Sequence, residues 1–306
     1  MIQVGIIGSG FIGPAHIEAL RRLGGVNVVA LCDSSLAVAQ ERADALHIPH
    51  AYGSVEALLA HPGLQVVHNC TPNYLHADIN RQILRAGLHV FSEKPLCMTP
   101  DEARELERLA QQVGVVHGVS FVYRQFAMVQ QAASMVRSGS VGRLFAVQGS
   151  YLQDWMLLET DYNWRVDAVQ GGNSRAIADI GSHWCDTVQF VTGKRIVEVM
   201  ADLAIVWPVR KASIASNATF GQQMADVQFE DKAVTTEDRG SVLVRFDDGS
   251  KGCFSVSQVS AGRKNHLSFE INGSQCSLHW DQETPQQLWV GHRQQANQIL
   301  TDDPGL

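Results

Sequence analysis

The sequence predicts an α/β protein of two domains: an N-terminal doubly wound parallel sheet over residues 1–120, and a C-terminal α/β domain with a large, mostly antiparallel open sheet over residues 121–306. The chain has 306 residues, about twice the roughly 150 of a single domain. Up to about residue 120, short β-branched runs alternate with helical patterns, which is typical of βαβ units. Beyond residue 140 the apolar runs lengthen and alternate with polar residues, which favours antiparallel strands.

The first half holds apolar runs that we expect to be strands, separated by helical segments. Pro14–Leu23 is expected to be a helix, because Pro suits the first helical turn. Its spacing predicts that Ile17, Leu20 and Leu23 share one face. Another helix is expected to begin at Thr99-Pro100-Asp101-Glu102, where a Thr cap is followed three residues later by Glu. The predicted strands are Ile2–Ile7, Val26–Cys32, Gln65–Cys70, His89–Ser92 and Val115–Ser120.

The second half combines alternating runs, turn signals and one strong helix. Asp247-Asp248-Gly249-Ser250 and Asn272-Gly273 are expected to be hairpin turns, because Gly and Asn tolerate the positive φ of tight reversals. The helix is predicted over Arg175–Val191. The predicted strands are Leu144–Gln153, Val197–Val206, Ser241–Phe246, Lys251–Ser257, Leu267–Asn272 and Cys276–Trp280.

Composition and charge narrow the classes of partner. The net charge is −7, from 24 Lys and Arg against 31 Asp and Glu, which opposes binding to nucleic acid or to an anionic membrane surface. No apolar run reaches the 18 or so residues of a membrane helix. The six cysteines are scattered without a C-x-x-C pair, and the chain opens on a strand rather than a signal peptide. These features predict a cytoplasmic protein with a small neutral ligand.

A glycine-rich loop follows the first strand and opens the first helix: Gly8-Ser9-Gly10-Phe11-Ile12-Gly13. In such a loop the first Gly allows the tight turn, the second lets the backbone approach a pyrophosphate, and the third permits close helix packing. Asp33 follows Gly13 by twenty residues, where a carboxylate bonds ribose hydroxyls and repels a 2′-phosphate. The pattern predicts NAD rather than NADP. The alternative is a structural turn with a surface Asp.

Three later segments carry candidate chemistry. Thr71–His76 and Glu93-Lys94-Pro95 lie where strands of an open α/β sheet are expected to end, which is where ligands bind in this architecture. Asp179–Asp186 lies on the predicted second-half helix. Oxidation of an alcohol needs a base for the hydroxyl proton and a group that stabilises alkoxide character, while the hydride leaves for nicotinamide.

These residue types suit that task. Asp179 and His183 are four residues apart, so the carboxylate can orient the imidazole, and Lys94 can place a positive charge beside the reacting oxygen. Each has a structural alternative: a surface lysine, a hydrogen-bonded structural pair, or, with Asp186, a metal site, although no H-E-x-x-H pattern supports a metal. His76 has the alternative of a helix N-terminal residue that contacts backbone.

In order and spacing, these motifs resemble the Gfo/Idh/MocA family of oxidoreductases, named for glucose-fructose oxidoreductase and inositol dehydrogenase. The motifs are Gly8–Gly13, Thr71-Pro72-Asn73 with His76, Glu93-Lys94-Pro95, and Asp179 with Gly181, His183 and Asp186. The resemblance implies a Rossmann domain, nicotinamide-dependent oxidation or reduction of a sugar or polyol hydroxyl, and oligomerisation through the open sheet. It implies Lys94, Asp179 and His183 as the catalytic trio. The cofactor residues so expected are Gly8, Gly10, Phe11, Ile12, Gly13, Asp33, Thr71, Pro72, Asn73, His76, Glu93 and Lys94.

Aromatic and amide groups gather before the predicted catalytic helix. Tyr151–Trp155 and Asp161–Arg165 mix flat rings with hydrogen-bonding groups, which suits sugars, although such rings are also ordinary core residues. The stretch is similar to the branch of the family that includes levoglucosan dehydrogenase. Val122 stands where the family's Asn-Tyr-Arg segment has Asn, before Tyr123. The substrate-binding residues so expected are Tyr123, Gln153, Trp155, Trp164, Arg165, Asp179 and His183.

The leading hypothesis is therefore an NAD-dependent sugar or polyol dehydrogenase that forms a keto-sugar. It is expected to be a homodimer or homotetramer assembled through the C-terminal sheet. The alternatives are a non-catalytic dinucleotide-binding sensor of the same fold, and a methyltransferase that uses the same glycine loop. Because relatives usually continue with further helices, the chain is expected to be truncated or to lack that C-terminal element.

Overall fold

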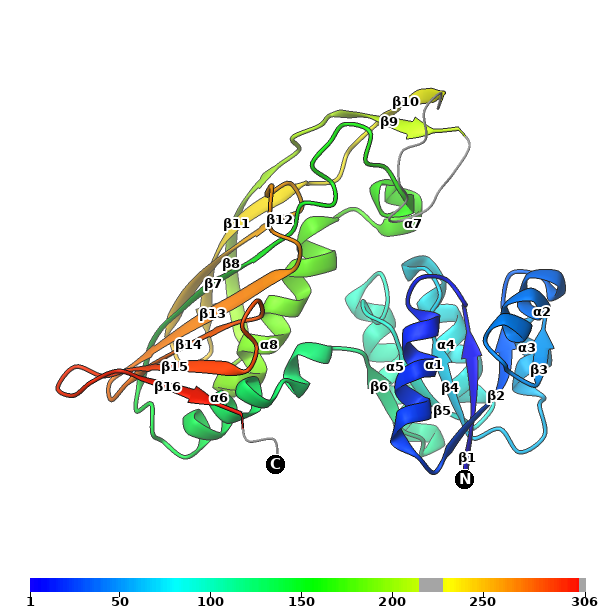
Figure 1. Cartoon of the computed structure of the whole chain (residues 1–306), viewed down its shortest axis with the longest axis horizontal. Coiled ribbons are helices and arrows are strands. Elements are labelled where there is room, and N and C mark those ends of the chain that lie inside the picture. The colour runs from blue at the N-terminus through cyan, green and yellow to red at the C-terminus, as the bar shows by residue number, and fades with distance from the viewer. Residues whose placement is uncertain (215–227, 303–306) are drawn as a thin grey trace. The chain divides into compact units, whose positions relative to one another are not determined.

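The computed structural model describes residues 1–214 and 228–302 (Figure 1). The chain divides into two compact units. The first unit contains Met1–Ser120 and the short segment Val169–Gly172, and the second contains Phe121–Ala168 and the chain from Asn173 onward. No helix among the described residues has the length and apolar character needed to cross a membrane.

The first unit is built on a six-stranded parallel sheet in the order β3-β2-β1-β4-β5-β6 (Figure 1). The strand order reverses beside β1, which is the point where open α/β sheets bind ligands. The short β3 was absent from the predicted strands because its residues, His-Ala-Tyr, include no β-branched side chain. The strands are β1 Ile2–Ile7, β2 Val26–Cys32, β3 His50–Tyr52, β4 Val66–Asn69, β5 His89–Ser92 and β6 His117–Val119.

Helices connect these strands, and their ends follow the sequence signals. The capping box at Thr99 is confirmed, since the Thr99 side chain accepts from the backbone N–H of Glu102. Of the three apolar residues expected on one face of α1, Ile17 and Leu20 are buried, while Leu23 is 73% exposed. Leu23 lies six residues, or about 240° of rotation, beyond Ile17, so it leaves the face. The helices are α1 Gly13–Leu23, α2 Leu36–Ala45, α3 Val55–Leu59, η1 Asn73–Leu75, α4 His76–Arg85 and α5 Pro100–Val113.

The second unit is built on an eight-stranded sheet in the order β16-β15-β14-β13-β7-β12-β11-β8. Its pairs are antiparallel except β7 with β12, so the predicted α/β fold class is confirmed for both halves. The strands β9 and β10 form a separate pair. The strands are β7 Leu144–Leu152, β8 Ile196–Ala204, β9 Val209–Ser213, β10 Phe229–Ala233, β11 Arg239–Phe246, β12 Lys251–Ser257, β13 His266–Gly273, β14 Ser277–Asp281, β15 Gln287–Gly291 and β16 Gln298–Thr301.

One of the two predicted hairpin turns is correct. Asp247–Ser250 joins β11 to β12, with Gly249 at φ +84°. The prediction for Asn272-Gly273 is wrong, because both residues belong to β13 and the reversal follows them. A Cβ at Gly273 would lie 2.2 Å from the carbonyl oxygen of Val141. Glycine serves close backbone approach there rather than positive φ.

Two α-helices, α6 and α8, cover one face of this sheet (Figure 1). Trp184 of α8 stacks on Phe254 with ring centroids 4.4 Å apart, which seats the helix on the sheet. The predicted single helix Arg175–Val191 is wrong in its first part, where Ile177–Gly181 forms a π-helix. The Ser182 N–H donates to the carbonyl oxygen of Ile177, five residues earlier, as in a π-helix. The helical elements are η2 Val122–Gln125, α6 Ala127–Arg137, η3 Trp164–Val166, α7 Ala168–Gly171, the π-helix η4 Ile177–Gly181 and α8 Ser182–Thr192.

Candidate active site

The three glycines of the loop between β1 and α1 each meet a different steric demand. Gly8 has φ +92°, and a Cβ there would lie 2.8 Å from the carbonyl carbon of Cys70. A Cβ at Gly13 would lie 2.4 Å from the carbonyl oxygen of Gly8. A Cβ at Gly10 would meet no heavy atom within 4 Å, so its backbone faces open space at the start of α1. A helix N-terminus with open backbone beside it suits the pyrophosphate of a dinucleotide.

Asp33, directly after β2, presents a carboxylate beside this loop. Its Oδ2 accepts the backbone N–H of Ser9 at 2.9 Å, and its Oδ1 accepts that of Ser34 at 2.7 Å. Burial raises the pKa of Asp33, but hydrogen bonds from Ser9 and Ser34 lower it more, so the pKa lies below its usual value. An ionised carboxylate here fits ribose hydroxyls and repels a 2′-phosphate.

A buried amide chain supports the Thr71 loop. The Thr71 hydroxyl donates to Asn69 Oδ1 at 2.7 Å, and Asn69 Nδ2 donates to Asn80 Oδ1 at 2.9 Å. Asn80 Nδ2 in turn donates to the Ser92 hydroxyl at 2.9 Å. Asn69, Asn80 and Ser92 are buried, and the sequence reasoning missed them. The one signal was a polar residue at the end of each apolar strand run, since Asn69 ends β4 and Ser92 ends β5.

His76 joins two loops through backbone carbonyls. Its ring is 1% exposed, with Nδ1 2.6 Å from the Pro95 oxygen and Nε2 2.7 Å from the Thr71 oxygen. This placement corresponds to the alternative in which His76 contacts backbone. The residue therefore fixes the Thr71 loop against the turn after β5, where the Lys94–Pro95 peptide bond is cis.

Glu93 anchors the turn that carries Lys94. Its Oε1 lies 3.0 Å from His16 Nε2 on α1, and its Oε2 accepts the backbone N–H of Lys94 at 3.1 Å. Burial raises the pKa of Glu93, but hydrogen bonds from His16 and Ser120 outweigh it and leave the pKa below its usual value. His16 Nδ1 also lies 2.9 Å from Nδ1 of His68 in β4. His16 and His68 were not among the predicted site residues.

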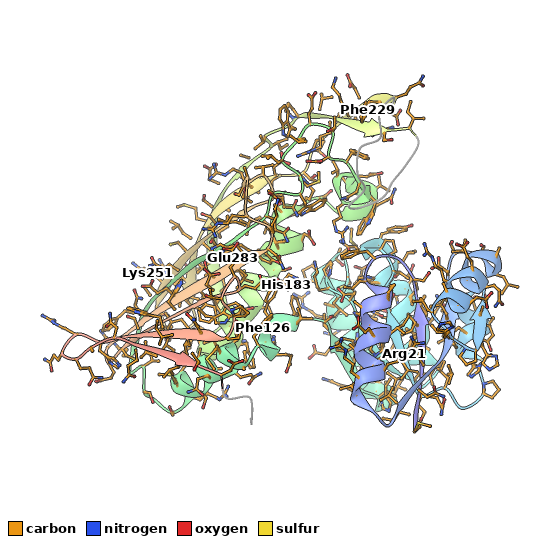
Figure 2. All side chains as sticks on the ribbon, viewed as in Figure 1. Arg21, Phe126, His183, Phe229, Lys251 and Glu283 are labelled. Atoms are coloured by element: carbon orange, nitrogen blue, oxygen red, sulfur yellow. The ribbon has the colours of Figure 1, made fainter. Side chains whose placement is uncertain are left out.

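In the second unit, His183 lies at the start of α8 (Figure 2), and aromatic rings surround it. His183 is 7% exposed, and its ring centroid lies 5.0 Å from that of Tyr123, 6.0 Å from Tyr151 and 5.7 Å from Phe121. Burial raises the pKa of both tyrosines, and the negative charge of Asp179 raises it further. The predicted pair Asp179 and His183 therefore shares one cluster with Tyr123 and Tyr151.

Asp179 lies on the π-helix and is held from two sides. Gln258 Nε2 donates to Asp179 Oδ2 at 2.9 Å, and Arg165 Nε lies 3.9 Å from Asp179 Oδ1. The Arg165 guanidinium stacks over the Trp164 ring at 4.4 Å from its centroid. The predicted residues Trp164 and Arg165 thus lie beside the carboxylate, and Gln258 is a partner that the sequence reasoning missed.

A hydrogen-bonded chain connects the remaining predicted substrate residues through Asn265. Trp155 Nε1 donates to Gln153 Oε1 at 2.8 Å, and Gln153 Nε2 donates to Asn265 Oδ1 at 2.9 Å. The Tyr151 hydroxyl donates to the same oxygen at 2.5 Å, and Asn265 Nδ2 lies 3.3 Å from the Tyr123 hydroxyl. Asn265 was also missed, because it follows no motif and precedes a strand that pairs with β7.

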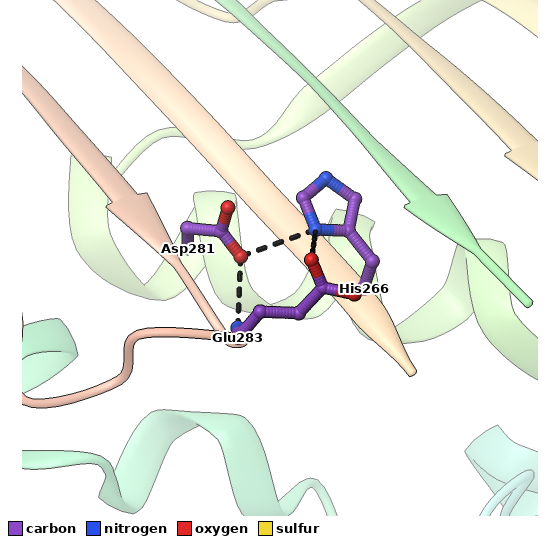
Figure 3. A group of neighbouring side chains, drawn as sticks. All are labelled: His266, Asp281 and Glu283. Atoms are coloured by element: carbon purple, nitrogen blue, oxygen red, sulfur yellow. Dashed lines mark hydrogen bonds and ion pairs between the residues drawn. The ribbon is translucent and has the colours of Figure 1, made fainter. Parts of the chain in front are cut away.

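Two acidic groups bear on the question of a metal. Asp186 forms a two-pronged ion pair with Arg124, one contact of which is 2.7 Å, so its carboxylate has a cationic partner. Elsewhere, His266 Nδ1 lies 3.1 Å from Asp281 Oδ1 and 3.3 Å from Glu283 Oε2 (Figure 3). Arg263 pairs with Glu283 and lies 3.5 Å from His266 Nδ1. Because Glu283 already has a guanidinium partner, we interpret the group as an ion-pair cluster.

Comparison with known proteins places the chain in a family. The family model of an oxidoreductase family with an NAD-binding Rossmann fold matches residues 2–121, and the GFO/IDH/MocA C-terminal domain matches residues 129–279. Levoglucosan dehydrogenase of Pseudarthrobacter phenanthrenivorans is 28% identical over 300 residues, which cover 94% of this chain and 76% of that protein.

Solved structures agree with this assignment. Levoglucosan dehydrogenase in complex with NADH and L-sorbose superposes with a TM-score of 0.89 at 26% identity, covering 100% of this chain and 81% of that one. An inositol dehydrogenase homologue from Azotobacter vinelandii complexed with NAD⁺ gives a TM-score of 0.85 at 28% identity, covering 98% and 76%. This chain therefore belongs to the Gfo/Idh/MocA family and is an NAD-binding oxidoreductase.

Proposed function

We propose that this protein transfers a hydride between a ring hydroxyl of a sugar or polyol and NAD, with a keto-sugar as the oxidised product. The observation that carries the proposal is the cluster in the second unit, where His183 packs against Tyr123 and Tyr151, and Asp179 lies beside Arg165 and the same tyrosines. A base, a carboxylate and flat rings are what alcohol oxidation on a sugar requires.

Each proposed catalytic residue has one task. His183 accepts the hydroxyl proton, and the rings packed around it keep bulk water from competing for that proton. Asp179 orients the imidazole and offsets its positive charge. Lys94 supplies positive charge to the oxygen as it develops alkoxide character. When bound, NAD supplies the acceptor of the hydride. Gly10 would hold its pyrophosphate and Asp33 its adenosine ribose.

The proposed substrate contacts combine stacking with hydrogen bonds. The Trp164 ring offers an apolar face to the C–H side of a pyranose, while Gln153 and Arg165 offer donors and acceptors for hydroxyls. Relatives named for levoglucosan oxidation, one of them complexed with L-sorbose, support this substrate class. Their dehydrogenase names favour turnover over the alternative of a non-catalytic sensor.

The test is NADH absorbance with a panel of anhydrosugars, pyranoses, ketoses and inositols. We expect NAD reduction with at least one of them, and a loss of kcat of at least about 100-fold in His183→Ala and Lys94→Met. NAD binding without turnover of any compound contradicts the proposed activity. Near wild-type kcat in either variant contradicts the role given to that residue.

We also propose assembly into a homodimer or homotetramer through the open face of the eight-stranded sheet. A groove of about 700 Å³ lies on this sheet, and Met200 and Leu243 among its lining residues are 67% and 52% exposed. Light scattering should give a multimer that Leu243→Glu dissociates; a monomeric wild type contradicts the proposal. The cytoplasm is the proposed compartment, since reducing conditions suit six free cysteines.

A further inference from the structure

We propose that Gln258 is a positioning residue, which fixes the Asp179 carboxylate by linking it to a buried cluster of charges. The inference rests on the proposed function in that Asp179 serves the reaction. Gln258 directly follows β12 and is fully buried. Its amide lies between two charged side chains: Nε2 is 2.9 Å from Asp179 Oδ2, and Oε1 is 3.3 Å from Arg175 Nη1.

The chemistry of these partners determines which way the amide points. A guanidinium can only donate, so the oxygen of Gln258 must face Arg175. The amide nitrogen of Gln258 must then face Asp179, where it needs an acceptor. The planar amide of Gln258 therefore fixes the Asp179 carboxylate relative to the Arg175 guanidinium. Its N–H donor also favours the ionised form of that carboxylate.

Arg175 is itself immobilised. Its side chain and that of Asp238 are both 0% exposed and form an ion pair, and Arg210 Nη2 donates to the same Asp238 oxygen at 2.7 Å. The other oxygen of Asp238 accepts the backbone N–H of Val206 at 2.6 Å. Because Asp238 holds the buried Arg175 guanidinium in place, Gln258 bonds a partner that does not move.

Glu237, the residue before Asp238, holds the backbone that precedes Asp179. Glu237 Oε1 accepts the Ser174 hydroxyl at 2.8 Å, the Arg175 N–H at 3.0 Å and the Ile177 N–H at 2.9 Å. The last two donors are backbone N–H groups at the start of the helical segment, which a carboxylate satisfies. Glu237 thus fixes the main chain that leads to Asp179, while the Arg175–Gln258 link fixes the Asp179 side chain.

Other titratable groups also face Asp179. Arg165 Nε lies 3.9 Å from Asp179 Oδ1. The hydroxyls of Tyr123 and Tyr151 are near enough for the Asp179 charge to raise their pKa. His183 packs against both tyrosines. Gln258 carries no charge and donates a close hydrogen bond to the carboxylate. It orients Asp179 without cancelling its charge. An arginine at the same distance would cancel that charge.

Gln258→Glu is the sharpest test, because it keeps an acceptor for Arg175 and replaces the donor to Asp179 by a like charge. Two facing carboxylates share a proton, so the pKa of the pair rises. In the wild-type holoenzyme, kcat/KM is measured against pH with a sugar that it turns over. We expect the acid limb to move upward by about one pH unit or more in the variant. Gln189→Glu, the same change at a Gln that accepts the Ile196 N–H, should leave the profile unchanged.

Gln258→Met gives a second readout that simple loss of stability does not mimic. Without the donor, Asp179 is free to turn, so kcat should fall about 10- to 100-fold in the folded variant while KM changes less than about threefold. A Gln258→Glu profile that matches the wild type, or a Gln258→Met variant with unchanged kcat, overturns the inference while the proposed function stands.

The converse failure is also distinguishable. If the wild type turns over no sugar, the proposed function fails, and the link is tested by carboxyl ¹³C titration of Asp179, assigned through Asp179→Asn. A higher pKa of Asp179 in Gln258→Glu, and not in Gln189→Glu, supports the link. An unchanged pKa overturns it.

Discussion

The two units build their candidate sites in different ways. In the first unit, the functional groups lie on short motifs at strand ends: the loop after β1, Asp33 after β2, and Glu93 and Lys94 after β5. In the second unit, Asp179 and His183 lie on one helical segment, but some of their partners come from strands or strand ends far away in the chain, such as Tyr151 in β7 and Gln258 after β12. The first kind of site depends on spacing along the sequence, and the second on the register between strands.

Strand register explains the assembly in the second unit. Ser257 at the end of β12 pairs with Leu152 at the end of β7, and Leu152 pairs with His266 at the start of β13. The next residues outward, among them Gln258 and Asn265, therefore meet at one edge of the sheet. Polar partners of a site can thus lie where several strands end together, even with no motif around them.

The largest expected effect tests how far the second unit depends on its buried charges. Asp238→Leu leaves Arg175 and Arg210 without their shared anion, and removing one partner of a buried ion pair costs about 3 to 5 kcal/mol. We expect a loss of about 4 kcal/mol in the free energy of unfolding, measured by urea denaturation. The control Asp247→Leu, whose ion pair with the 82% exposed Arg195 lies at the surface, should cost about 1 kcal/mol or less. Equal losses in the two variants contradict the buried-charge account.

The next prediction separates the steric role of Gly8 in the first unit from the cofactor-binding role of Gly10. Gly8→Ala forces a side chain into φ +92° and against Cys70, which should cost about 2 to 3 kcal/mol of stability. Gly10→Ala meets open space, so its stability should stay within about 0.5 kcal/mol while NAD binding weakens at least about tenfold. Thermal denaturation and NAD titration by fluorescence measure both. A stable Gly8→Ala, or unaltered NAD affinity in Gly10→Ala, contradicts the steric assignments.

These outcomes bear on what the sequence could predict. β1, β2 and β5 were predicted to the residue, because each is a short apolar run with clear ends, and so was the cap at Thr99. The π-helix was not, since its residues fit the ordinary helical pattern and its altered hydrogen bonds depend on tertiary packing.

The candidate site also contains residues that the sequence predicted and partners that it did not. Lys94, Asp179 and His183 were named from local motifs and a family resemblance. Gln258 and Asn265 were missed because strand pairing, rather than spacing, brings them to Asp179 and Tyr151. Pairing register depends on the packing of the whole sheet and leaves no local signature.

A smaller effect is expected from the buried histidines of the first unit. Burial, together with a smaller contribution from the neighbouring His16, lowers the pKa of His68 to about 4, although the charge of Glu93 opposes the shift. Below about pH 6.5 the unfolded chain binds a proton at His68 that the folded chain does not. The free energy of unfolding therefore keeps this contribution at neutral pH and loses it as the pH falls towards 4. This group alone should cost about 2 kcal/mol between pH 7 and pH 5. His68→Asn should lose less stability over that interval in urea denaturation at each pH; an identical pH dependence contradicts the assignment.

The smallest expected effect concerns the choice between dinucleotides. Asp33→Asn removes the negative charge but keeps an oxygen that can accept the Ser9 N–H, so the loop geometry should survive. Binding of NADP should strengthen about tenfold, which is about 1.4 kcal/mol, because the 2′-phosphate no longer faces a carboxylate, while NAD binding weakens slightly. Fluorescence titration with both dinucleotides measures this. Asp44→Asn, which removes an exposed charge from α2, is the matched control and should change neither affinity. Unchanged NADP affinity in Asp33→Asn means that the backbone around the loop, and not this charge, discriminates between the cofactors.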